Sequence, residues 1–258
     1  MAEFKSHTSG TFCLFELSTT DQDGAKSFYT SLFNWSCDDN PNSPVGTYTM
    51  FTLQGRDVGG AYTQFKEQTA AGMRPFWDLY ISITSADRTA KKAAQLGGKV
   101  IIAPFDVSTY GRMAVIRDPT GAAFCIWEAK SHIGVQTKNE PGSFCWADLA
   151  TPHPETAAKF YTDLFGWTTI PGDGGYLHLR NGDEFIGGIP PCHTPAGVPP
   201  HWTSYVQVKD CDETVARARE LGAKIRLEPE SVGKAGRMSV LSDPQGATFA
   251  IFEVAERS

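Results

Sequence analysis

The chain of 258 residues has 41% apolar, 12% aromatic and 20% charged side chains, a composition typical of soluble globular proteins. Its formal charge of −6 argues against nucleic acid or an anionic membrane as a partner, because both attract clustered lysine and arginine. The sequence has no apolar run long enough to span a bilayer, and its first ten residues, MAEFKSHTSG, lack the apolar core of a signal peptide. We therefore expect a cytoplasmic protein that binds a small organic molecule.

Two long segments of the chain are nearly the same. Residues 12–35 read FCLFELSTTDQDGAKSFYTSLFNW, and residues 144–167 read FCWADLATPHPETAAKFYTDLFGW. The sequence Asp-Pro-x-Gly-Ala also occurs twice, from Asp118 and from Asp243. A repeat unit of this size is that of an ordinary domain rather than of a solenoid. We predict two homologous domains, residues 1–130 and 142–258, joined by a polar linker at 131–141.

The first half of each domain is predicted to contain a strand, a helix and three strands. Helical spacing places Ala25, Phe28, Tyr29, Leu32 and Phe33 on one face, and the same pattern follows Pro154. Thr20 or Asp21 can cap the first helix, and proline suits the first turn of the second. Asn181-Gly182 predicts a hairpin between strands near 176–179 and 185–189.

The second half of each domain repeats that order. In the first domain a strand is predicted at 79–83, a helix at about 86–96 that ends at Gly97, and strands near 99–102, 112–116 and 123–127. The Asp-Pro-x-Gly sequences suit type I turns. The chain is therefore predicted to be an α+β protein of four βαβββ modules.

The order of these motifs resembles the vicinal oxygen chelate superfamily, which includes glyoxalase I, extradiol dioxygenases, and fosfomycin and bleomycin resistance proteins. The resemblance rests on the Phe-Tyr-x-x-Leu-Phe-x-Trp helix end and on Leu-Gly followed by Asp-Pro-x-Gly-x-x-Phe-x-Ile, each present twice. It implies that two modules form one cup-shaped sheet in each domain. It also implies a divalent metal in the cup, held by side chains of the first and last strands of each module.

The positions that correspond to the family's metal ligands do not carry a usual ligand set. They are Leu14, about Gly60, Asp78 and Cys125 in the first domain, and Trp146, about Gly188, Thr203 and Ala250 in the second. We therefore predict cups without the usual metal site and no cofactor. The alternative is that Glu16, two residues beyond Leu14 on the same strand face, converges with Asp78 and Cys125 as an acid–base pair or an unorthodox metal site.

Aromatic side chains on or beside the cup strands are the other ligand-binding candidates. They are Tyr48, Trp77, Tyr80, Trp146 and Tyr205, with Trp202 and Tyr176 at related places. Packing between modules is an equal explanation for Trp77 and Trp202. Asp148 is a candidate for orienting a ligand, and Arg112 for holding an anion, although an arginine at a strand start is more often a surface residue.

The histidines and cysteines are interpreted as structural or incidental. His178, His193 and His201 fall close together in the sequence, but none occupies a predicted ligand position, so they are interpreted as surface or loop residues. Cys13, Cys125 and Cys145 lie inside apolar strands, where a free thiol behaves as a small hydrophobic group.

These observations favour a small-molecule binding protein of the glyoxalase and bleomycin resistance type. Its ligand would be an aromatic or amphipathic metabolite or antibiotic, and the first cup is the more promising. The rival interpretation is a lyase, isomerase or hydroxylase-like enzyme that uses Glu16 and Asp78, and a third is a scaffold for partner proteins. Four modules in one chain fit a monomer with an internal pseudo-two-fold axis or a homodimer.

Overall fold

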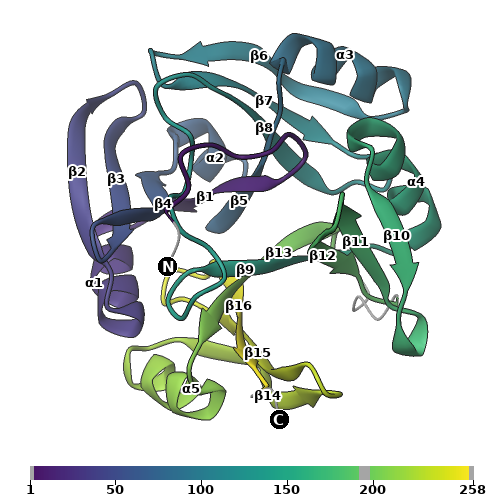
Figure 1. Ribbon diagram of the computed structural model, residues 1–258. Coiled ribbons are helices and arrows are strands. Elements are labelled where there is room, and N and C mark those ends of the chain that lie inside the picture. The colour runs from purple at the N-terminus through teal and green to yellow at the C-terminus, as the bar shows by residue number, and fades with distance from the viewer. Residues whose placement is uncertain (1–2, 192–197, 256–258) are drawn as a thin grey trace.

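The computed structural model describes residues 3–191 and 198–255, and Cys192 and His193 lie outside these ranges. Two eight-stranded sheets, one in each domain, form the architecture (Figure 1). The elements of the first domain are β1 (Phe12–Thr19), α1 (Gln22–Phe33), β2 (Ser36–Ser43), β3 (Gly46–Leu53), β4 (Arg56–Thr63), α2 (Lys66–Ala70), β5 (Phe76–Ser82), α3 (Ala86–Gln95), β6 (Lys99–Val107), β7 (Gly111–Arg117) and β8 (Ala123–Ala129).

The second domain repeats this order with shorter strands at the start. Its elements are β9 (Phe144–Ala150), α4 (Pro154–Phe165), β10 (Thr168–Pro171), a 3₁₀ turn η1 (Asp173–Gly175), β11 (Leu177–Asn181), β12 (Glu184–Ile189), β13 (His201–Val208), α5 (Cys211–Glu220), β14 (Lys224–Val232), β15 (Gly236–Ser242) and β16 (Thr248–Val254). The predicted hairpin, the four main helices and the α+β fold of four βαβββ modules are confirmed.

Both sheets have the same strand order. It is β2-β3-β4-β1-β5-β8-β7-β6 in the first and β10-β11-β12-β9-β13-β16-β15-β14 in the second. The first strands of the two modules, β1 and β5 or β9 and β13, are antiparallel neighbours at the centre. Asn40 of β2 donates a hydrogen bond to the Tyr110 hydroxyl beyond β6 at 3.5 Å, so side chains from the two edges of the first sheet come into contact.

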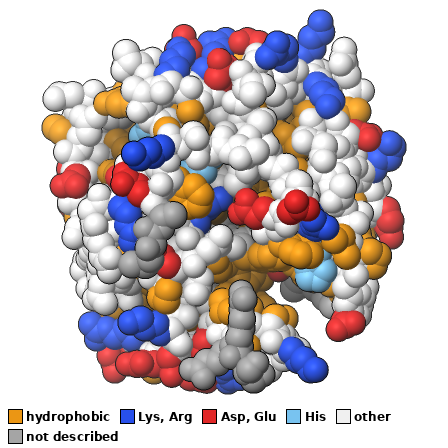
Figure 2. Space-filling view, viewed as in Figure 1, with side chains coloured by type: hydrophobic (Ala, Val, Ile, Leu, Met, Phe, Trp, Pro, Cys, Tyr) orange, Lys and Arg blue, Asp and Glu red, His pale blue; other side chains and the backbone are white. Residues whose placement is uncertain are grey.

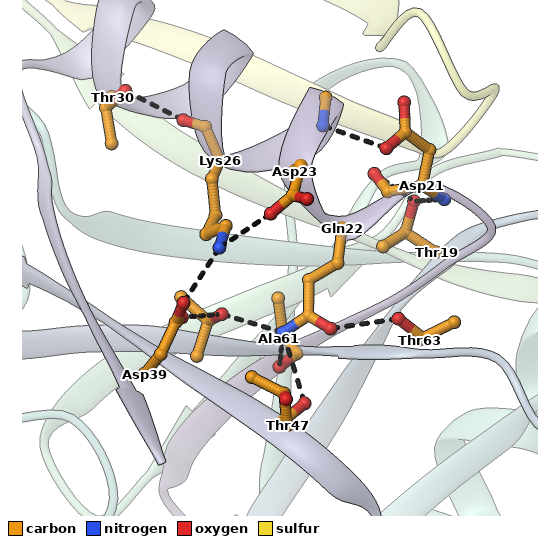
Figure 3. Close-up of polar contacts among 12 residues, drawn as sticks. Thr19, Asp21, Gln22, Asp23, Lys26, Thr30, Asp39, Thr47, Ala61 and Thr63 are labelled. Carbon is orange, nitrogen blue, oxygen red and sulfur yellow. Dashed lines mark hydrogen bonds and ion pairs between the residues drawn. The ribbon is translucent and has the colours of Figure 1, made fainter. Parts of the chain in front are cut away.

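Helix α1 is fixed to its own sheet by a buried glutamine. Asp21 caps the helix by accepting from the Gly24 N–H at 3.0 Å. In the next position, the Gln22 amide donates to the Thr49 hydroxyl at 2.7 Å and to the Ala61 carbonyl at 3.2 Å, and its oxygen accepts from Thr63 (Figure 3). These bonds satisfy a polar group that would otherwise be costly to bury.

The two domains share one hydrophobic core. The helix-covered faces of both sheets contribute to a single cluster of buried side chains, and Phe15 of β1 stacks on Phe144 of β9 with ring centroids 3.9 Å apart. Because these faces pack against each other, the opposite, helix-free faces point away from the domain interface. We call the helix-free face of the first sheet cup 1 and that of the second sheet cup 2.

Paired hydrogen bonds cross the domain interface. The Tyr29 hydroxyl of α1 donates to Asp243 Oδ2 in the second domain at 3.0 Å, and accepts from the Trp77 indole at 2.9 Å. Asp243 is the aspartate of an Asp-Pro-x-Gly turn, so the motif joins the domains as well as forming a turn. The reciprocal set is Tyr161 with Asp118 at 3.0 Å and Trp202 at 2.9 Å.

The predicted linker is built into the first sheet. The Val135 N–H donates to the Cys13 carbonyl and the Gln136 N–H to the Asp57 carbonyl, each at 2.7 Å, so the segment lies between the starts of β1 and β4. Gly134 has φ +100°, and a Cβ at this residue would lie 2.0 Å from the Cys13 carbonyl oxygen. Only glycine fits this approach.

Candidate functional site

A row of directly paired residues crosses the floor of cup 1. Glu16 of β1 lies opposite both Gly60 of β4 and Asp78 of β5, and Gly60 lies opposite Met50 of β3. Residues directly opposite one another in a sheet point to the same face. The structure therefore brings Glu16 and Asp78, the two predicted catalytic candidates, side by side.

Two tyrosines hold the Glu16 carboxyl group. The Tyr80 hydroxyl donates to Glu16 Oε2 at 2.6 Å, and the Tyr48 hydroxyl also hydrogen-bonds to this carboxyl group. Tyr48 lies over Gly60, where an added Cβ would be 1.9 Å from its hydroxyl oxygen. Burial raises the pKa of Glu16, and the two tyrosines oppose that rise.

Asp78 is the most strongly perturbed carboxyl group of cup 1. Burial, with the neighbouring charge of Glu16 as a second cause, raises the pKa of Asp78 to about 8. The Cys125 thiol beside it favours the charged form only slightly. At neutral pH Asp78 is therefore mainly a neutral carboxylic acid, able to donate a hydrogen bond.

The remaining wall of cup 1 is apolar. Met113 lies 3.9 Å from the Tyr80 hydroxyl, and Val115 packs with it against a small cluster that includes the buried Leu14 and Cys125. Phe105 and Ile102 of β6 lie opposite these two residues and are 43% and 47% exposed. The cup thus combines a polar floor with an exposed apolar rim.

Cup 2 has the same arrangement with different side chains. Asp148 takes the place of Glu16 and accepts from the Trp146 indole at 2.9 Å and from the hydroxyls of Tyr176 and Tyr205 at 2.5 and 2.8 Å. Burial raises the pKa of Asp148, and these three donors oppose that rise. Figure 2 shows the molecule hollowed between the two ends of the second sheet, with hydrophobic side chains lining the hollow.

Two predicted site residues do not face a cup. Trp77 is 8% exposed and lies in the shared core, because strand alternation turns it away from Asp78 and Tyr80. Arg112 points outward, where its guanidinium forms paired hydrogen bonds with Asp87 at 2.9 Å. Trp77 is therefore a core residue and Arg112 a surface residue, which agrees with the alternative explanations given for them from the sequence.

Three residues in or beside the cups were missed as candidates. Phe105 and Ile102 form the rim of cup 1, and His178 in cup 2 lies opposite Gly188, which in turn lies opposite Asp148. The alternation Tyr176, His178, Arg180 before the Asn-Gly turn was the available signal, since it places three polar side chains on one strand face. The position of His178 among aromatic rings results from strand pairing, which the sequence alone does not reveal.

The cup floors do not fit a divalent metal site of the family's kind. In place of a side chain from β4 or β12, the floors have Gly60 and Gly188, each covered by a tyrosine hydroxyl. The carboxyl groups of Glu16 and Asp148 are already bound by tyrosines. Within residues 3–191 and 198–255, no three His, Cys, Asp or Glu side chains are grouped to hold a metal ion.

Comparison with known proteins establishes the family. The model of the Glyoxalase/Bleomycin resistance protein/Dioxygenase superfamily matches residues 11–126 and 143–251. The chain belongs to this superfamily. Its two matched regions coincide with the two sheets, so each domain is a complete superfamily unit. Among the helices that the structure describes, none has the length and hydropathy needed to cross a bilayer.

Relatives in the superfamily align along most of this chain. The chain is 40% identical to "Putative glyoxylase CFP32" of Mycobacterium tuberculosis, over 99% of both chains. It is 34% identical to "Anthracycline biosynthesis protein DnrV" of Streptomyces peucetius, over 94% of this chain and 92% of the relative.

Solved structures of superfamily members show the same fold at low identity. The Mn(II)-bound glyoxalase of Novosphingobium aromaticivorans superposes with a TM-score of 0.67 at 18% identity, over 96% of this chain and 83% of its own. The 2,3-dioxygenase LapB of Pseudomonas sp. KL28 has a TM-score of 0.64 at 14% identity, over 97% and 94%. These likenesses concern the fold alone.

Proposed function

We propose that the protein binds a flat aromatic or amphipathic small molecule in cup 1 without a metal ion. The observation that carries this proposal is the pairing of Glu16 with Asp78 in a cup whose edge strand β6 exposes Phe105 and Ile102. A neutral Asp78 can donate to a ligand oxygen while the tyrosine-bound Glu16 stays in place. The apolar rim then covers the ring face of the ligand.

The relatives support the choice of probe. Two curated relatives are named anthracycline biosynthesis proteins, so a hydroxylated aromatic ring system is a reasonable ligand class to test. Quinone and phenol oxygens at the edge of such a molecule match the donor and acceptor groups of Asp78 and Tyr80. We propose this class for cup 1.

Calorimetric titration with 1,8-dihydroxyanthraquinone tests the proposal. We expect micromolar affinity that falls at least about tenfold in Asp78→Asn and in Phe105→Ser, a loss of about 1.4 kcal/mol or more. Arg112→Ala, which lies outside the cup, is the matched control and should bind like the wild type. Equal affinity in all four proteins would show that cup 1 is not the site.

Elemental analysis tests the metal-free part separately. Protein purified without chelators, and again after dialysis against Mn, Fe, Ni and Zn salts, should contain no stoichiometric divalent metal. One equivalent per chain that disappears in Glu16→Gln would contradict the proposal and indicate an unorthodox site at these carboxyl groups.

A second candidate function is acid–base catalysis at the same pair. The raised pKa of Asp78, to about 8, beside a second carboxyl group is the arrangement used by lyases and isomerases to move a proton. In this function Glu16 would accept a proton and Asp78 would donate one to the bound molecule. Turnover of a bound probe that is abolished in Asp78→Asn, with binding retained by Glu16→Gln, would favour it over simple binding.

A further inference from the structure

The floor of cup 2 contains an ionisable side chain that cup 1 lacks. The paired rows both have glycine and then a carboxylate in the middle and differ in chemistry at the two ends. They are Met50, Gly60, Glu16 and Asp78 in cup 1, and His178, Gly188, Asp148 and Thr203 in cup 2. The second carboxyl group of cup 1 is thus replaced by threonine, and a methionine by an imidazole. The two floors offer different chemistry to a ligand.

His178 lies among aromatic side chains with one nitrogen unpaired. Its ring centroid is 4.8 Å from that of Tyr176, 6.3 Å from Trp146 and 5.6 Å from Phe185. Among the residues that the structure describes, His178 Nδ1 is buried and has no hydrogen-bond partner. Its Nε2 faces Gly172 at the rim, where an added Cβ would lie 2.7 Å from it.

Arg180, two residues further along β11, has a second unpaired nitrogen. Its Nη2 donates to Asp183 at 2.8 Å, but its Nε is buried and has no partner within residues 3–191 and 198–255. The guanidinium carbon lies 5.4 Å from the centroid of the Phe185 ring. One ring, itself 48% exposed, therefore packs against both His178 and Arg180.

Unpaired buried nitrogens of this kind favour a ligand that pairs them. A buried nitrogen without a hydrogen bond is destabilised, because it has lost its contact with water and gained no partner. The exposed Phe185 ring packs against both side chains. The carboxyl group on the floor does not compete, because Asp148 already accepts from Trp146, Tyr176 and Tyr205.

We propose that cup 2 is a second binding site, for a flat aromatic carboxylate whose acid group is bound by His178 and Arg180 when the Phe185 ring turns aside. The Nδ1-protonated imidazole and the guanidinium Nε–H each donate to one carboxylate oxygen. The aromatic part of the ligand packs against Trp146 and Tyr176. This site goes beyond the proposed function and does not depend on a ligand in cup 1.

Titration with 1-hydroxy-2-naphthoate, followed by tryptophan fluorescence and calorimetry, tests the site. We expect saturable binding that weakens at least tenfold in His178→Met, which copies the residue of cup 1, and in Arg180→Thr. The uncharged 1-naphthol should bind at least tenfold more weakly to the wild type. Phe185→Ala should accelerate association in stopped-flow measurements, because the ring that packs against both side chains is removed.

Three controls separate this site from others. His201→Gln, in the same domain but hydrogen-bonded to the Pro199 carbonyl, should bind naphthoate like the wild type. In the Asp78→Asn background, which weakens cup 1, His178→Met should still lower the naphthoate affinity at least tenfold. Circular dichroism and thermal unfolding should show that His178→Met is folded, and its binding of dihydroxyanthraquinone should be unchanged. Absence of naphthoate binding up to millimolar concentration, or undiminished binding by His178→Met and Arg180→Thr, would overturn the proposal while leaving the proposal for cup 1 intact.

Discussion

Cup 1 and cup 2 are built on one repeated scaffold but present different floors. Both have a carboxyl group bound by two tyrosine hydroxyls over a glycine. Cup 1 adds a second carboxyl group, Asp78, where cup 2 has Thr203, and cup 2 adds His178 where cup 1 has Met50. The difference shows that the scaffold tolerates different ionisable pairs in the same row.

The domain interface, in contrast, is the same in both directions. Tyr29 and Tyr161 each donate to the aspartate of the other domain's Asp-Pro-x-Gly turn, and each accepts from a tryptophan. The repeated motifs therefore serve the interface, while the cups differ.

The largest expected effect concerns residues 134–136, which lie between the starts of β1 and β4 in the first sheet. In Gly134→Ala the new Cβ would lie 2.0 Å from the Cys13 carbonyl oxygen at φ +100°, so the free energy of unfolding should fall by about 3 kcal/mol or more. Urea denaturation measures it. Gly55→Ala, also at positive φ but with open space around it, is the control and should lose about 1 kcal/mol.

If Gly134→Ala were no less stable than Gly55→Ala, the linker would not be packed into the first sheet as described. Dihydroxyanthraquinone binding to the Gly134 variant then shows whether residues 134–136 influence the shape of cup 1.

A pH series separates the carboxyl pair of cup 1 from the row of cup 2. Asp78 has a pKa of about 8 when folded and 3.8 ordinarily, so between about pH 4 and 8 the folded state binds a proton that the unfolded state lacks. Its contribution to stability therefore declines as pH rises through this window. The free energy of unfolding of Asp78→Asn minus that of the wild type should therefore be higher at pH 8 than at pH 5, by at least about 1 kcal/mol.

Thr203→Val, at the equivalent place in cup 2, should keep the wild-type pH dependence. Urea midpoints at pH 5 and pH 8 give the comparison. If the midpoint changed equally between the two pH values in Asp78→Asn and in the wild type, this would contradict a raised pKa at Asp78.

Matched tyrosine variants test whether the two equivalent halves of the domain interface contribute equally to stability, in contrast to the two cups, which differ. Tyr29→Phe removes the tyrosine partner of Asp243 Oδ2 and of the Trp77 indole, and Tyr161→Phe does the same for Asp118 Oδ2 and Trp202. Each should lower the free energy of unfolding by about 1–3 kcal/mol. A loss in only one of the two variants would show that the domains depend on the interface unequally.

The smallest effects are expected outside both cups. Arg112 and Arg237 form exposed ion pairs with Asp87 and Asp212 at equivalent places. Replacement of either arginine by alanine should leave the urea midpoint close to that of the wild type, because solvent screens exposed ion pairs. Calorimetric affinities for both probes should stay at the wild-type value, and a tenfold loss in either variant would place that arginine in a binding site after all.

Much of the fold followed from the sequence because its signals are local. Helical spacing around Phe28 and Tyr29, the Asn-Gly turn and the Asp-Pro-x-Gly turns all act within a few residues. The duplication then extended each interpretation to the other half. The linker was predicted to be a polar connector, but Val135 is buried in the sheet, because the space between two strands cannot be read from composition.

The candidate site was only partly predictable. Glu16 was found through strand alternation, Asp78 through the family resemblance and Tyr80 as an aromatic residue on a cup strand. Strand alternation would also have turned Trp77 away from the cup. His178 was set aside because it occupies no predicted ligand position, and only strand pairing through Gly188 places it in one row with Asp148. Unpaired nitrogens such as His178 Nδ1 appear only when every side chain is placed.

The shared core has a consequence for any screen of ligands. Because Phe15 and Phe144 stack across the interface and both domains contribute to one buried cluster, the chain should unfold as a single cooperative unit. A molecule bound in either cup then raises the melting temperature of the whole chain. A rise in melting temperature therefore shows that a molecule binds but not in which cup. Two different molecules that bind in different cups should together raise the melting temperature further than either alone.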